Sequence, residues 1–77
     1  MPRVEFTIEP FNEGQPGRHV TAPTDMLRSM EVDVEVGPFG SSCDVPGERV
    51  GEVVATITRV ALEHGASHVN LHVEAAE

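Results

Sequence analysis

The chain has 77 residues with 13 acidic side chains, five arginines and no lysine, so its formal net charge is −8. This length suits one domain over residues 1–77. The arginines are isolated from one another along the sequence rather than clustered, which disfavours nucleic acid and anionic membrane surfaces as partners. Cys43 is the sole cysteine, which excludes an internal disulfide and a cysteine-based zinc site. A chain of this length can bury only a thin core and gains stability from self-association, so we expect a homo-oligomer, a dimer or tetramer.

The first part of the chain predicts a strand followed by a helix. Apolar and polar residues alternate over 4–8, which indicates a strand with one buried face that Pro10 ends. A turn-rich loop over 12–17 leads into residues 20–30, where apolar side chains recur at roughly helical spacing. Pro23 removes a backbone donor, so this helix is either kinked there or begins its regular part there.

A pair of short strands follows. Valines alternate with other residues over 32–36, and residues 41–45 are extended enough to pair with them. The glycines and proline of 37–40 break the apolar run, so the two pieces predict a hairpin around that turn.

The last part of the chain predicts the strongest helix and a final strand. Apolar residues recur at three and four positions over 50–61, while polar residues including Thr56 face elsewhere. Pro46 suits the first turn of this helix and Gly65 its C-terminal cap. Residues 69–73 then alternate as a fourth strand.

This βαββαβ order predicts an α+β, ferredoxin-like fold. Two interleaved strand–helix–strand halves with right-handed crossovers give a four-stranded antiparallel sheet in the order 4-1-3-2, with both helices on one face. The expected buried layer contains Val4, Phe6, Ile8, Val20, Leu27, Val32, Val34, Val36, Val50, Val54, Ile57, Ala61, Val69, Leu71 and Val73. The other, open face is expected to carry Glu5, Thr7, Glu9, Asp33, Glu35, His68, Asn70, His72 and Glu74.

The two histidines of the last strand are the obvious candidates for catalysis or metal binding. Four strand positions place His68 and His72 about 13 Å apart, too far to share a metal without partners from another strand. Pairing one of them with Glu5 or Glu9 is an open alternative, but we expect solvated or interface histidines. With no phosphate-binding or nucleophile motif in the sequence, we expect neither metal, cofactor nor enzymatic activity.

The segment 37–42 has a different character. Its two glycines let the backbone approach another molecule closely, Phe39 offers a ring for stacking, and Ser41 and Ser42 offer short hydroxyls. These are the ingredients of a site for a small aromatic ligand. A turn anchored in the core by Phe39 is the alternative interpretation of the same pattern.

Several stretches together resemble the thiamine-binding, YkoF-like family over nearly the whole chain. They are Ile8-Glu9-Pro10-Phe11, His19-Val20, residues 32–41, residues 63–66 and residues 69–73. The most specific is the hairpin turn, where the family tends to carry Gly or Thr, then Pro, an apolar residue, Gly, and Thr or Ser. The resemblance implies an oligomeric or tandem βαββαβ domain that binds thiamine or its hydroxymethylpyrimidine part without converting it.

Under this resemblance we expect a small carrier or sensor of a thiamine-like compound. An aminopyrimidine favours an aromatic sandwich with hydrogen-bond partners, and a thiazolium cation gains from nearby acid. The expected ligand-binding residues are Glu9, Phe11, His19, Phe39, Gly40, Ser41 and Ser42. The alternative function is a structural or regulatory oligomerisation module without a small ligand. No apolar run approaches the ~20 residues of a membrane span and none resembles a signal peptide, so we expect a cytoplasmic protein.

Overall fold

The computed structural model describes residues 1–11 and 17–76, so most of the loop expected over 12–17 lies outside the described residues. The strands and helices follow one another in the expected order. The strands are β1 (Arg3–Glu9), β2 (Glu35–Gly37), β3 (Gly40–Asp44) and β4 (His68–Glu74). They form one antiparallel sheet in the order β2-β3-β1-β4, which is the predicted order 4-1-3-2 counted from the other edge. The ferredoxin-like α+β prediction is therefore confirmed.

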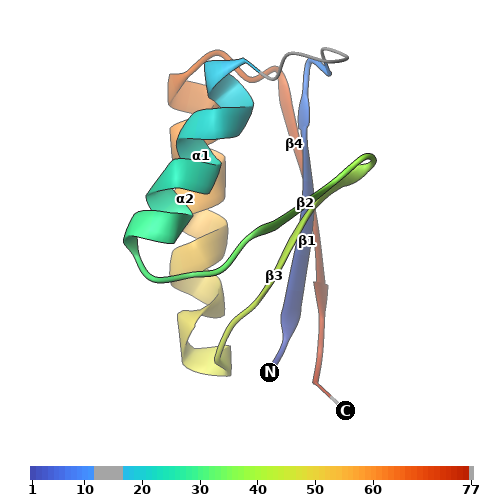
Figure 1. Cartoon of the computed structure of the whole chain (residues 1–77), viewed down its shortest axis with the longest axis vertical. Helices are drawn as coiled ribbons and strands as arrows, with labels where there is room; N and C mark the ends of the chain where they lie inside the picture. Colours follow the sequence, from blue (N-terminus) through green and yellow to red (C-terminus); the bar gives the residue numbers. More distant parts are fainter. Residues whose placement is uncertain (12–16, 77) are drawn as a thin grey trace.

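Both helices lie against the same face of the sheet (Figure 1). They are α1 (Arg18–Ser29) and α2 (Val50–Glu63), the latter preceded by a 3₁₀ turn at Gly47–Arg49. The described chain has no helix whose length and apolar character would let it cross a membrane.

The core fills the space between β1 and the two helices. Val4, Phe6 and Ile8 point inward from β1, whereas the residues between them are exposed, as the period of two predicts. Leu27 from α1 and Ile57 from α2 are completely buried against this strand. Each such side chain contributes about 1.5–3 kcal/mol when it leaves water, so this cluster dominates the stability of a small domain.

Pro23 lies inside α1, and the helix begins five residues earlier, at Arg18. Of the two alternatives for this segment, a regular helix that begins at Pro23 is therefore wrong. The proline ring is fully buried, which offsets the backbone hydrogen bond that it cannot donate. Directly after it, the hydroxyl of Thr24 donates to the carbonyl of Val20 at 3.1 Å, so this buried polar side chain is satisfied within the helix.

The second helix ends as predicted, but one of its polar residues is buried. Gly65 has φ +94°, which lets the amide of Ala66 donate to the carbonyl of Ala61 at 3.0 Å and close the helix. Thr56, expected to face away from the core, is only 7% exposed. Its hydroxyl donates to the carbonyl of Glu52 at 2.8 Å and lies 3.8 Å from the sulfur of Met30, the residue that follows α1. The buried hydroxyl is therefore satisfied within its own helix.

The outer strands are less covered than the sequence predicts. Strand β2 spans three residues rather than 32–36, and Val36 is 59% exposed. In β4, Val73 is 48% exposed. Both valines lie on the helix side by register, since Val36 pairs with Ser41 and Val73 with Val4. The predicted burial of these two valines is wrong because the helices do not extend over these parts of the outer strands.

Candidate functional site

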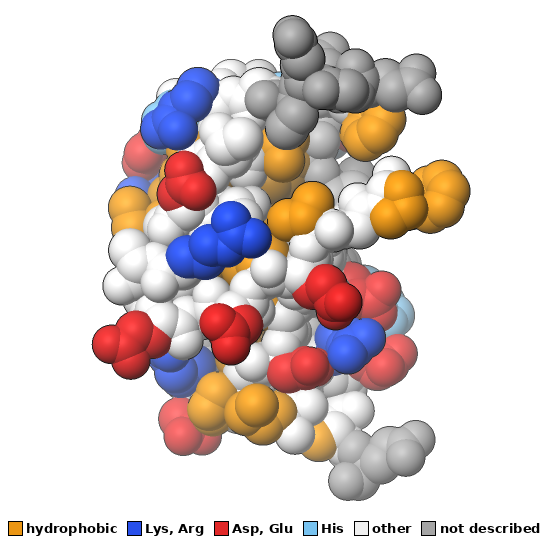
Figure 2. Space-filling model, viewed as in Figure 1, with side chains coloured by type: hydrophobic (Ala, Val, Ile, Leu, Met, Phe, Trp, Pro, Cys, Tyr) orange, Lys and Arg blue, Asp and Glu red, His pale blue; other side chains and the backbone are white. Residues whose placement is uncertain are grey.

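The sheet face opposite the helices carries a row of polar residues that crosses all four strands. The main-chain register aligns Glu35 of β2 with Ser42 of β3, Ser42 with Glu5 of β1, and Glu5 with His72 of β4. Side chains directly opposite one another in a sheet are neighbours, so Glu5 stands between a hydroxyl and an imidazole. Figure 2 shows acidic side chains gathered with a basic one and a histidine at the right, along the sheet.

A groove of about 370 Å³ lies between β1 and the β2–β3 hairpin. It is lined by residues 5–7 of β1 and residues 35–42 of the hairpin. Phe6 and Ser41 are nearly buried on the helix side, so their main chain forms part of the floor. Glu5, Thr7 and Ser42 project from the open face, because neighbouring strand residues point to opposite sides.

The hairpin turn places Phe39 at the tip of this groove. Gly37 pairs with Gly40, so Pro38 and Phe39 form a two-residue turn. The Phe39 ring is 91% exposed, and orange side chains project at the upper right of Figure 2, where Figure 1 shows the hairpin tip. The interpretation of Phe39 as a core anchor is therefore wrong, and its ring is accessible to another molecule.

The two serines of the hairpin lie on opposite faces. Ser42 aligns with Glu5 on the open side, whereas Ser41 aligns with the core residue Phe6 and is 9% exposed. Only the Ser42 hydroxyl therefore shares a face with the carboxylates of Glu5 and Glu35. Of the expected ligand-binding residues, the groove contains Phe39, Gly40, Ser41 and Ser42.

The other three expected ligand-binding residues do not line the groove. The carboxylate of Glu9 accepts a hydrogen bond from the Asn70 amide at 3.0 Å, and Phe11 follows β1 as an exposed side chain. His19 is buried, with Nε2 2.6 Å from the carbonyl of Pro10. A carbonyl only accepts, so Nε2 carries the hydrogen and His19 ties α1 to the segment after β1.

Glu5, Thr7 and Glu35 line the groove but are missing from the ligand-binding set predicted by sequence. Strand alternation assigned them to the open face, but it gives no register between strands. The alignment of Ser42 with both glutamates is what brings the carboxylates to the hairpin.

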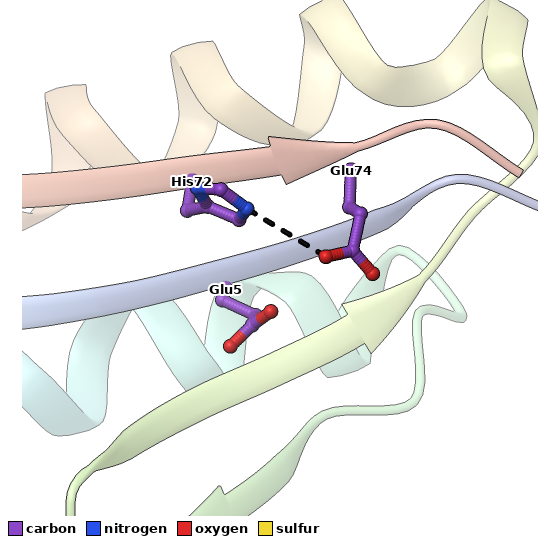
Figure 3. Close-up of side chains that lie close together, drawn as sticks. All are labelled: Glu5, His72 and Glu74. Carbon is purple, nitrogen blue, oxygen red and sulfur yellow. Dashed lines mark ion pairs between the residues drawn. The ribbon is translucent and has the colours of Figure 1, made fainter.

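Next to the groove, Glu5 belongs to a second group with His72 and Glu74 (Figure 3). One potential ligand atom from each of the three side chains lies within 4.8 Å of the other two. His72 Nε2 is 3.7 Å from a carboxylate oxygen of Glu74. The sequence left a pairing of His72 with Glu5 as an alternative, and in the sheet these two residues are direct cross-strand neighbours. Glu74 joins them because it lies two residues further along the same face of β4.

Arg3, the cross-strand partner of Glu74, forms an ion pair with Asp44. Arg3 Nε donates to the carboxylate of Asp44 at 3.2 Å. That hydrogen bond, and then the charge of Asp44, raises the pKa of Arg3. On the other face of β3, the Cys43 thiol is buried, and burial raises its pKa. A thiol in this state is a poor nucleophile.

Comparison with solved structures supports the fold. No protein-family model and no curated protein matches this sequence. The chain is similar to protein SP2199 from Streptococcus pneumoniae, with 20% identity and a TM-score of 0.69 over 99% of this chain and 87% of that one. It is also similar to a domain of unknown function, DUF77, from Bacillus cereus, with 16% identity and a TM-score of 0.67 over 95% and 71%. These neighbours share the fold.

Proposed function

We propose that this chain binds a small cationic heterocycle, thiamine or a related hydroxymethylpyrimidine, in the groove between β1 and the hairpin, without converting it. The observation that carries the proposal is the combination of an accessible aromatic ring, Phe39, with the two carboxylates of Glu5 and Glu35 along one groove. The groove's volume of about 370 Å³ falls in the range of small-molecule sites. The family resemblance of the hairpin supports the same ligand class.

Each part of the groove suits a part of such a ligand. Phe39 offers a face on which a flat ring can stack, and a cationic ring gains further from an aromatic face. Glu5 and Glu35 offset a positive charge, and Ser42 can donate to or accept from a ring amine. In a chain with a net charge of −8, attraction of a cation over longer range acts in the same direction. The role proposed is that of a cytoplasmic carrier or sensor.

Calorimetry with thiamine, thiamine phosphates and hydroxymethylpyrimidine tests this function. Phe39→Ala is expected to weaken binding about tenfold, because it removes a stacking and cation–π partner. Phe11→Ala is the matched control, since Phe11 is also an exposed phenylalanine but lies outside the groove. Absence of heat with all compounds would remove the ligand assignment. An equal loss of affinity in the Phe39→Ala and Phe11→Ala variants would show that the ligand does not bind in the groove.

We also propose that the protein works as a dimer or tetramer. Val36 and Val73 are exposed apolar side chains on the outer strands, and burying them against another copy would stabilise a small domain. Sedimentation equilibrium tests this proposal. An oligomer that binds none of the compounds would favour the alternative function, an assembly module without a small ligand.

A further inference from the structure

We propose that Glu5, His72 and Glu74 form a binding site for a divalent transition-metal ion of the zinc class on the open face of the sheet. This goes beyond the proposed ligand function and does not depend on it. The three side chains come from two adjacent strands, β1 and β4, and Figure 3 shows them projecting to the same side. One imidazole and two carboxylates are a donor set that such ions accept.

The geometry needs only side-chain movement to close around an ion. Glu5 and His72 are direct cross-strand partners, and Glu74 is two positions from His72 on the same face. The ligand atoms lie within 4.8 Å of one another. Bonds of about 2.0–2.2 Å would bring them to roughly 3.3 Å apart in a tetrahedral site. All three side chains are exposed, so rotation about their own bonds can make this change while the strands stay in place.

Among the four histidines, His72 is the one directed at carboxylates. His19 Nε2 binds the carbonyl of Pro10, and His64 Nδ1 lies 2.9 Å from the carbonyl of Val60. His68 Nδ1 lies 3.0 Å from the hydroxyl of Ser67. His72 Nε2 instead faces Glu74 at 3.7 Å, with Glu5 on the neighbouring strand. This difference gives the site a built-in control, because His68 lies on the same strand and is also exposed.

The charge around the three residues favours a cation. All five arginines lie in the described part of the chain, and none forms an ion pair with Glu5 or Glu74. Arg3 is the cross-strand partner of Glu74 and its charge acts on Glu5, but its guanidinium is bound to Asp44. Four of them pair with Asp44, Asp25, Glu52 and Glu63, and Arg28 donates to the carbonyl of Val34. Within residues 1–11 and 17–76, the carboxylates of Glu5 and Glu74 are therefore not neutralised by a direct ion pair with an arginine. A dication would relieve the repulsion between these carboxylates.

The direct test is titration of tag-free protein with zinc chloride by calorimetry. The wild type is expected to bind one equivalent. His72→Ala should weaken binding about tenfold or more, because it removes the nitrogen ligand, while His68→Ala should bind as the wild type does. Equal zinc affinity in the wild type and the His72→Ala variant, or an equal loss in both variants, would overturn the site.

A second measurement uses the unmodified protein. Zinc added to isotope-labelled wild type should shift the imidazole resonances of His72 and leave those of His68 in place. Shifts confined to His68, or no shift of His72, would contradict the site independently of how any variant folds.

The metal proposal and the ligand proposal can be tested separately, because Glu5 belongs to both sites, Glu74 only to the metal site and Phe39 only to the groove. Glu5→Gln should weaken zinc and the thiamine-like ligand together, whereas Glu74→Gln should weaken zinc alone. Phe39→Ala should weaken the heterocycle and leave zinc binding unchanged. Zinc affinity that is unchanged in both the Glu5→Gln and the Glu74→Gln variants would contradict the metal site without contradicting the ligand groove.

Discussion

Gly40 lies so close to Thr7 that a Cβ atom at position 40 would come within 2.9 Å of Thr7 Cγ2 and 3.1 Å of the Phe6 carbonyl oxygen. The glycine also has φ +148°, a backbone conformation that other residues rarely adopt. Both constraints arise where β3 approaches β1 at the floor of the groove. This position therefore requires glycine for space and for conformation.

Gly40→Ala is expected to lower the free energy of unfolding by about 1–3 kcal/mol, because the methyl group meets main chain and the backbone is strained. Gly51→Ala is the control. A Cβ at this exposed helix position meets nothing within 4 Å, so alanine should stabilise α2 by about 0.5–1 kcal/mol. Urea denaturation measures both values, and a neutral Gly40→Ala would show that the hairpin can shift away from β1.

His19 is expected to contribute to stability rather than to ligand binding. His19→Ala removes the hydrogen bond to the Pro10 carbonyl and leaves space beneath α1, which should cost about 1–3 kcal/mol. The exposed His68→Ala should change stability by less than about 0.5 kcal/mol. Thermal or urea unfolding of the two variants measures the difference. A His19→Ala variant that is destabilised but keeps the wild-type ligand affinity would show that this histidine has a structural role.

Cys43 makes stability fall in alkaline solution. Burial, helped by the charge of Asp44, raises the pKa of the folded thiol, so the unfolded chain loses its proton first as the pH rises past about 8.5. The free energy of unfolding should therefore be lower at about pH 9.5 than at about pH 7.5. The chain has neither lysine nor tyrosine, so few other groups titrate in this window.

Cys43→Ala provides the control for this pH dependence. Its free energy of unfolding should be lower overall, because a buried sulfur is lost, but it should lack most of the alkaline decline. Thiol-reactive reagents should also modify the folded wild type much more slowly than the urea-unfolded chain. Parallel pH profiles of the two proteins would show that the thiol is not responsible.

The topology was predictable because its local signals agree. The alternation over 4–8 and the helical spacing over 50–61 each assign one buried face, and Gly65 ends the second helix as expected. Coverage of the outer strands was not predictable. Val36 and Val73 continue the same apolar pattern as Val4, but pattern does not tell how far a helix reaches across a sheet.

The candidate site was predictable in part for a related reason. The glycines, Phe39 and the serines form a contiguous segment, so their common location could be inferred from the sequence. The meeting of Glu5 with His72 and Glu74 depends on cross-strand register, which alternation leaves undetermined. His19 does not line the groove because its ring binds a main-chain carbonyl, a partner that residue types do not indicate.

The placement of Ser41 and Ser42 on opposite sides of the sheet limits how the hairpin can vary. Adding or removing one residue between β2 and β3 would rotate every following side chain of β3 by half a turn if pairing with β1 resumed one residue out of step. Cys43 would then face water and Asp44 would enter the apolar layer. Homologues of this chain should therefore keep the number of residues in this turn at two.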